Sequence, residues 1–344
     1  MMRAIRKLLV LFLIAVGSYH VLEEMSQWSN KTNEHLFRSL HKKEHKLESK
    51  VLSQNDSLFQ WIGRAVDTLE EVYGEADHKH LSAYGYTWWV YTDQTDQYIQ
   101  FGIEDEKVVT VYTAGHSKEA EPVHIGDTYA EVNEQLSFGD AVTYDNFTFR
   151  LNQQEERTRP LAKLSNNVFI QCYFDTFTNQ LAAMRIATGD VLLKHSAYEI
   201  AYRGTLPESI TLNKDEWSEV EKGMEEQLYA LTNMVRKRYG KESLEWAADV
   251  SEVAFLHSQD MKENDYFSHY DLNGNGLKER LLEKNIYYAE ASENIAAQYP
   301  DAPSAMAGWL NSKSHREALL NETYTHIGVG VYRLYYTQNF LSVP

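Results

Sequence analysis

The chain of 344 residues is short of cysteine, proline and basic residues, and each shortage excludes a class of protein. Its single cysteine, Cys172, cannot form an intrachain disulfide, so the fold cannot be a disulfide-stabilised scaffold. Cys172 lies in the apolar run 168–174, and we interpret it as a small buried thiol rather than a nucleophile. With only 6 prolines, long disordered linkers are not expected.

Positive charge is also scarce. The chain has 33 Lys and Arg residues and 50 Asp and Glu residues, which gives a net charge of −17. Such a surface repels phosphate backbones, so the chain is not expected to bind nucleic acid. It also repels anionic lipid headgroups everywhere except at the N-terminus. The sequence contains no Gly-rich phosphate loop, no Gly-x-Ser-x-Gly elbow and no His-Glu-x-x-His run.

The N-terminus is the one place with a basic start and a long apolar run. Arg3, Arg6 and Lys7 precede the apolar segment 8–17. This pattern predicts that residues 1–22 are a signal peptide or a membrane anchor, and that the chain meets the membrane only there. The protein is then secreted or anchored to the extracellular face of the cytoplasmic membrane. The near absence of cysteine in an exported protein favours a Gram-positive bacterium.

A polar segment, 23–57, follows, and a thin leucine and valine stripe predicts a helical stalk. Residues 58–200 then show one pattern twice. An Ile-Gly pair at 62–63 and again at 125–126 opens an amphipathic stretch that closes at Gly74 and Gly139 respectively, typical of a short helix with a glycine cap. Alternating segments predict strands at 84–91, 97–103 and 107–113 after the first helix, and at 146–151, 168–175 and 180–187 after the second.

We therefore expect an α+β domain built from a duplicated helix-plus-antiparallel-sheet unit. Its Ile-Gly pairs and the segments 86–91 and 173–175 resemble the CAP-associated N-terminal domain found before CAP domains in some Firmicutes proteins. That resemblance implies no chemistry. The aromatic residues Trp88, Trp89, Tyr91 and Tyr98 either pack in the core or form a stacking platform for a sugar or peptide.

A linker is expected at 201–217, and a second domain at 218–341. In that domain the patterns predict a helix at 218–239, a helix at 248–263 and a β-hairpin at 327–340. Three motifs stand out, Tyr-Phe-Ser-His at 266–269, Glu-Asn-Ile-Ala at 293–296, and the run 309–316, which begins with Trp and ends in His-Arg. This order of motifs resembles the bacterial branch of the CAP superfamily, also called SCP-like. The resemblance implies an α-β-α sandwich around an antiparallel sheet.

The resemblance also implies a cleft formed by two histidines and two acidic residues. By position, His269 and His315 are the histidines and Glu293 is the first acid. Ser312 stands where the second acid is expected, which weakens any transfer of activity. His257 is close in sequence and competes with His269, but we interpret it as structural or as a neighbour of the cleft.

Two neutral imidazoles can hold a divalent metal ion such as zinc, with Glu293 as a third ligand or as the base that activates a bound water. Without a metal, His269, Glu293, Ser312 and His315 form a polar cleft that binds a small molecule, lipid or peptide. We favour binding over catalysis. The alternatives are a metal-dependent hydrolase that acts on a peptide or cell-wall component, and a structural envelope or spore-associated protein. The stretch 271–276 resembles the start of a calcium loop, but Leu282 stands where the loop needs its glutamate, which favours a simple turn.

Overall fold

The computed structural model describes residues 57–92, 98–115 and 122–343. The predicted signal peptide or anchor, 1–22, therefore lies outside the described residues, as does the predicted stalk, 23–57, apart from its last residue. No helix in the described ranges has the length and hydrophobicity needed to cross a membrane.

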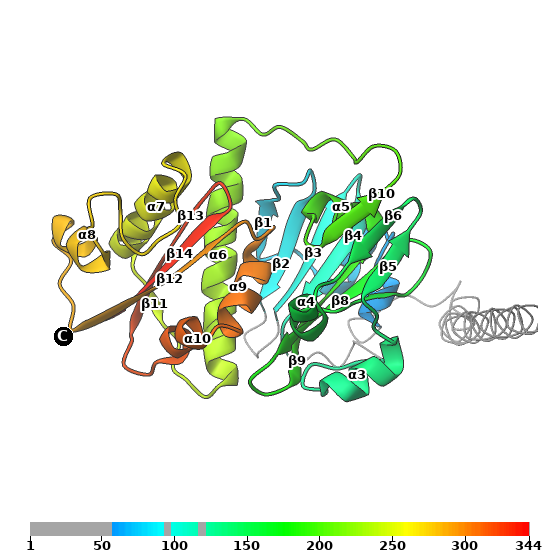
Figure 1. Ribbon diagram of the computed structural model, residues 1–344, viewed down its shortest axis with the longest axis horizontal. Coiled ribbons are helices and arrows are strands. Elements are labelled where there is room, and N and C mark those ends of the chain that lie inside the picture. Colours follow the sequence, from blue (N-terminus) through cyan, green and yellow to red (C-terminus); the bar gives the residue numbers. More distant parts are fainter. Residues whose placement is uncertain (1–56, 93–97, 116–121, 344) are drawn as a thin grey trace, which may run out of the picture. The chain divides into compact units, whose positions relative to one another are not determined.

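The N-terminal half is built on a seven-stranded antiparallel sheet in the order β1-β2-β3-β4-β9-β8-β7 (Figure 1). A smaller three-stranded sheet has the order β10-β6-β5. The strands are β1 (His78–Leu81), β2 (Thr87–Thr92), β3 (Tyr98–Glu104), β4 (Lys107–Thr113), β5 (Ala141–Tyr144), β6 (Phe147–Arg150), β7 (Leu161–Lys163), β8 (Val168–Asp175), β9 (Gln180–Thr188) and β10 (Glu199–Tyr202). The helices are η1 (Leu58–Gln60), α2 (Val66–Tyr73), α3 (Tyr129–Leu136), α4 (Gln153–Thr158) and α5 (Gly189–His195).

The two Ile-Gly segments make equivalent backbone contacts. The N–H of Gly63 donates to the carbonyl of Val108 at the β3–β4 hairpin, and the N–H of Gly126 donates to the carbonyl of Leu181 at the β8–β9 hairpin. Both glycines have positive φ, 84° and 102°, which a residue with a side chain rarely adopts. Each helix is thus attached to the tip of its own hairpin, and the two hairpins join where β4 pairs with β9.

The predicted first meander is confirmed as β2, β3 and β4, and Trp88, Trp89 and Tyr98 are buried. Two details of the second unit were wrong. The strand expected at 146–151 is β6, which pairs with β5 and β10 in the small sheet instead of joining β8. Helix α3 ends before Gly139 because Ser137 adopts the left-handed conformation, with φ 54°, and its N–H caps the carbonyl of Asn133.

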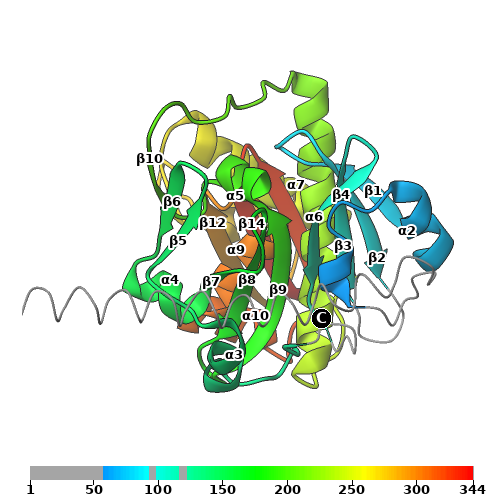
Figure 2. The ribbon, with the colours of Figure 1, turned by 90° about the vertical axis from the view of Figure 1, so that its right-hand side faces the viewer.

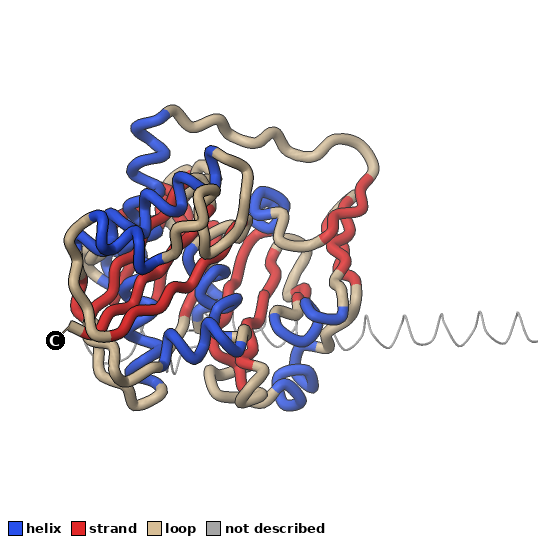
Figure 3. The backbone as a smooth tube through the Cα atoms, turned by 60° about the vertical axis from the view of Figure 1, so that its left-hand side comes forward, coloured by secondary structure: helices blue, strands red, loops and turns tan. Residues whose placement is uncertain are grey.

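The C-terminal half is an α-β-α sandwich, as the resemblance to the CAP family implies. Its four-stranded sheet has the order β11-β13-β14-β12, with β11 parallel to β13 and the other pairs antiparallel. Helices α7 and α8 lie on one side of the sheet, and α6, α9 and α10 on the other (Figures 1 and 3). The elements are α6 (Lys214–Arg238), β11 (Glu245–Trp246), α7 (Ala248–Glu263), α8 (Leu277–Glu283), β12 (Glu290–Ala297), α9 (Ala302–Leu310), α10 (Lys313–Leu320), β13 (His326–Tyr332) and β14 (Tyr335–Ser342).

Helix α7 and the β13–β14 hairpin match the predicted ranges closely. Helix α6 starts four residues earlier than expected, inside the predicted linker. The cause is a capping box, in which the Asn213 side chain accepts the N–H groups of Asp215 and Glu216, and the Glu216 carboxylate accepts the N–H of Asn213.

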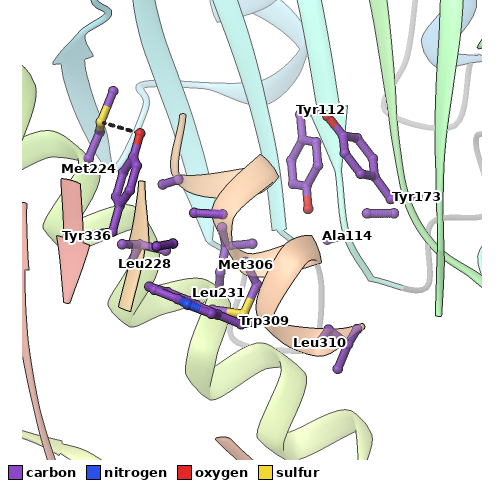
Figure 4. Packing of buried hydrophobic residues seen from close by; sticks show 14 of the residues in the cluster. Tyr112, Ala114, Tyr173, Met224, Leu228, Leu231, Met306, Trp309, Leu310 and Tyr336 are labelled. Atoms are coloured by element: carbon purple, nitrogen blue, oxygen red, sulfur yellow. Dashed lines mark hydrogen bonds between the residues drawn. The ribbon is translucent and has the colours of Figure 1, made fainter. Parts of the chain in front are cut away.

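The two halves share one hydrophobic core. Helices α6 and α9 lie between the sheet of the C-terminal half and the large sheet of the N-terminal half (Figure 1), and Figure 2 shows the same junction from the side of the N-terminal half. In Figure 4, Tyr112 and Tyr173 of the large sheet face Met306 and Leu310 of α9. A fully buried ion pair crosses the same junction, from Arg185 on β9 to Asp301 at the start of α9. Side chains of the two halves therefore meet directly at the junction.

Candidate functional site

Glu293 is the acidic residue of the predicted polar cleft. It projects from β12, and only 4% of its side chain is exposed. A buried carboxylate is costly unless it is paired, and here both oxygens have partners. Oε2 accepts a hydrogen bond of 2.5 Å from the Arg280 guanidinium on α8, and Oε1 lies 3.0 Å from Nδ1 of His269. Glu293 is therefore held in place by a cation on one side and a histidine on the other.

The two histidines beside Glu293 differ in their surroundings. His269 lies in the loop between α7 and α8 with 49% of its side chain exposed. His257 on α7 is buried, with Nε2 3.0 Å from the backbone oxygen of Ser268 and 3.8 Å from Glu293 Oε1. Burial lowers the pKa of His257 from its usual value of 6.5, more than the nearby Glu293 raises it. His257 is thus a neutral neighbour of the cleft.

Ser312 and His315 lie at the start of α10, on the other side of β12 from α8. The backbone oxygen of His315 accepts a hydrogen bond of 3.1 Å from the Asn294 side chain, next to Glu293 in the strand. Burial lowers the pKa of His315, and the nearby His269 lowers it further. His315 is therefore neutral at pH 7 and able to accept or donate one hydrogen bond.

A cavity of about 840 Å³ opens beside these residues, between the two halves of the chain. Ser312 and His315 line it, whereas His269 and Glu293 are not among its lining residues. Ile295 and Trp309 add apolar surface from the C-terminal half. The N-terminal half contributes residues such as Arg159, Tyr173 and Ser196.

The cavity carries little free charge. Arg159 donates a hydrogen bond of 2.7 Å to Glu155, which also lines the cavity, and another of 2.7 Å to the backbone oxygen of Ala197. With His315 neutral, the remaining polar groups that line it are hydroxyls, amides and backbone atoms. The arrangement is suited to a neutral ligand with hydrogen-bonding groups along its length.

Comparison with known proteins decides the family. The model of the CAP-associated N-terminal domain matches residues 62–198, and the model of the cysteine-rich secretory protein family, CAP, matches residues 229–343. A Bacillus subtilis protein, the uncharacterized membrane protein YlbC, is 36% identical over 99% of this chain and 99% of its own length. The chain belongs to the CAP family.

Two solved structures resemble most of this CAP protein. An extracellular protein with an SCP domain from Bacillus anthracis is 37% identical, with a TM-score of 0.79, covering 83% of this chain and 95% of its own. A cysteine-rich secretory protein from Staphylococcus aureus is 24% identical, with a TM-score of 0.73, covering 85% of this chain and 97% of its own, and it shows the fold alone. The family and fold predicted from the sequence are confirmed.

The metal interpretation of the CAP cleft finds less support in its geometry. Within the described ranges, one group of three His, Cys, Asp or Glu residues has ligand atoms within 4.8 Å of one another, and it does not include His269, Glu293 or His315. Glu293 is also engaged by Arg280 and His269. The assignment of His269 and His315 to a metal stays a prediction.

Sequence reasoning missed two kinds of residue in this site. Arg280 fixes Glu293, but nothing in its local sequence distinguishes it from any other charge on an amphipathic helix. The wall from the N-terminal half, including Arg159 and Tyr173, could not be expected, since the pattern of each half carries no information about how they pack together. The loop at Asp271 is a turn in which the carboxylate accepts the N–H groups of Asn273 and Asn275.

Proposed function

We propose that this CAP protein is an exported cell-envelope protein that binds an extended, neutral peptide in the cavity between its two halves, with His315 and Ser312 as polar contacts. One observation carries the proposal. A cavity of about 840 Å³, lined by side chains of both halves, lies directly beside the cluster of His269, Glu293 and Arg280. That volume is within the range of about 300–1,000 Å³ found for ligand pockets.

The shape of the lining favours a peptide over an ion. Strand β12 is an edge strand of its sheet, and its residues 295–297 line the cavity. An edge strand can pair with an extended segment through backbone hydrogen bonds, while side pockets receive the side chains. The aromatic rings of Tyr173, Trp309 and Tyr335 supply contact area at a low cost in conformational entropy.

The same geometry favours binding over hydrolysis. Each oxygen of Glu293 already has a hydrogen-bond partner, and only 4% of the side chain is exposed, so little of the carboxylate is open to a water that it could activate. The Arg280 cation stabilises the charged carboxylate, so Glu293 acts as a fixed anion that orients His269. In this proposal Glu293 shapes the cleft and does not take part in a reaction.

A peptide display library selected against the full chain tests the proposal. We expect a selected peptide to lose at least about 10-fold in affinity when His315 is replaced by Ala. The peptide group that hydrogen-bonds to the His315 ring is then left without a partner in the cavity. Ser312→Trp, which adds a bulky ring to the cavity lining, should abolish binding. The matched control is His124→Ala, a half-exposed histidine beside Asp127 at 3.6 Å and absent from the cavity lining.

Three outcomes would count against the proposal. These are a library without binders, a peptide that binds His315→Ala as tightly as the unchanged chain, and chelator-sensitive cleavage of the selected peptides. The last would favour the metal-dependent hydrolase instead. Circular dichroism of each variant separates loss of binding from loss of folding.

A further inference from the structure

A second polar cluster lies between the first strand of the large sheet and α6, and none of its residues lines the cavity at His315. It consists of His78 and His80 on β1 and Glu226 on α6. Alternate residues of a strand project to the same face, so the His-x-His spacing directs both imidazoles toward α6. Lys79 between them projects to the other face, where its ammonium lies 3.6 Å from the centre of the Trp89 ring.

The three side chains already have the spacing of a metal-ligand set. Glu226 Oε2 lies 2.9 Å from His80 Nε2 and 3.5 Å from His78 Nδ1, and all three ligand atoms lie within 4.8 Å of one another. Bonds of about 2.0–2.1 Å in a tetrahedral zinc site place neighbouring ligand atoms roughly 3.3 Å apart. The two printed distances lie on either side of that value, so an ion can be accommodated by small side-chain movements.

The surroundings of His80 also suit a ligand. Its side chain is 10% exposed, and its second nitrogen, Nδ1, lies 3.2 Å from the amide nitrogen of Gln227. The other amide atom, Gln227 Oε1, is buried and has no hydrogen-bond partner among the described residues. Rotation of this amide by half a turn would place Oε1 against Nδ1–H, the second-shell contact that a metal-bound histidine uses.

The helix and the strand approach each other unusually closely at this point. A Cβ placed on Gly223 would lie 2.6 Å from Cβ of His80, so only glycine allows α6 to pass here. A glycine inside a helix costs about 0.5–1 kcal/mol relative to alanine. Beside the cluster lies a cavity of about 520 Å³, lined by His78, His80 and Glu226. It leaves room for a water or another donor as a fourth ligand.

We propose that His78, His80 and Glu226 bind a zinc ion that links the N-terminal half to the CAP domain. Two imidazoles and one carboxylate are suited to zinc, whereas calcium and magnesium prefer oxygen ligands throughout. The second carboxylate oxygen of Glu226 lies 4.0 Å from the Lys222 ammonium, which leaves Oε2 to the ion. Since two ligands come from β1 and one from α6, the ion stabilises the junction between the halves.

Zinc titration of the metal-free full chain by calorimetry, with thermal unfolding in parallel, tests the site. We expect one zinc ion per chain and a higher unfolding temperature with zinc, because the ion binds the folded state. His78→Ala should weaken zinc binding by more than about 10-fold and remove the thermal shift. His78 is half exposed, with 52% of its side chain accessible, so its removal should leave the fold intact.

Glu226→Gln is the second variant, since it keeps the size of the side chain and removes the charge. Two controls separate this site from other histidines. His124→Ala and the double variant His269→Ala, His315→Ala should both keep the zinc affinity and the thermal shift. The proposal is overturned if zinc does not bind, if His78→Ala and Glu226→Gln bind it unchanged, or if only the double variant loses it.

Discussion

The buried ion pair between Arg185 and Asp301 gives the sharpest prediction for stability. Both side chains are almost completely buried, at 0% and 2% exposure, and they belong to different halves of the chain. Asp301 also caps α9, because its other oxygen accepts the N–H and hydroxyl of Ser304. Asp301→Asn keeps a capping oxygen and removes the charge, so its effect reports on the ion pair and not on the cap.

The expected cost follows from what remains after the substitution. Arg185 also donates to His195, but that neutral ring does not compensate a buried cation. Removing one partner of a buried pair costs about 3–5 kcal/mol, since the other charge is left unpaired in a medium of low polarity. For a body of this size, that corresponds to a fall of roughly 6–20 °C in the unfolding temperature.

Urea unfolding followed by circular dichroism measures the loss in the full chain. The control is Glu199→Gln, which removes one partner of the exposed Arg150–Glu199 pair at 3.3 Å and should change stability little. The double variant Arg185→Met, Asp301→Asn keeps the capping oxygen and should lose less than Asp301→Asn alone, because no charge is then left buried. A loss below about 1 kcal/mol for Asp301→Asn, or a double variant worse than the single one, would refute the expected cost.

Three further predictions concern other buried groups. Burial lowers the pKa of His195 to about 3 in the folded state. The unfolded chain therefore binds a proton that the folded chain does not, and the free energy of unfolding should fall by up to about 1.4 kcal/mol per pH unit below pH 6.5. The urea midpoint of His195→Gln should fall less over the same pH range than that of the unchanged chain. Burial raises the pKa of the Cys172 thiol, so a thiol reagent at pH 8 should modify it only after unfolding, and rapid modification of the native chain would contradict this. A Cβ at Gly330 would lie 1.9 Å from the backbone nitrogen of Phe255 on α7, so Gly330→Ala should cost about 3 kcal/mol, and a thermal midpoint equal to that of the unchanged chain would disprove the contact.

The sequence was most informative where the pattern is local. The range 248–263 has helical periodicity with no internal breaker, and it forms α7 at those residues. The start of α6 was misplaced because the capping signal, Asn213 with Glu216 three residues later, was not used. The strand at 146–151 was recognised, but strand pairing depends on contacts far apart along the chain, which periodicity does not specify.

The candidate site shows the same division. The resemblance to the CAP family named His269, Glu293, Ser312 and His315, and in the structure His269 contacts Glu293 while Ser312 and His315 line the cavity beside them. The His-x-His pair on β1 was visible in the sequence, yet its third partner, Glu226, lies almost 150 residues further on and is brought near only by packing of α6 against β1. When the proposed metal ligands come from both halves, the sequence of either half shows only some of them.

The position of the cavity also bears on how such proteins are dissected in the laboratory. A recombinant fragment that begins at α6 would keep His315 and Trp309 but would lack the side chains that Arg159, Tyr173 and Ser196 contribute to the same enclosure. Under the proposed function, a ligand screen on an excised CAP domain would test only part of the cavity lining. An experiment on this cavity therefore needs the N-terminal half and the CAP domain in one chain.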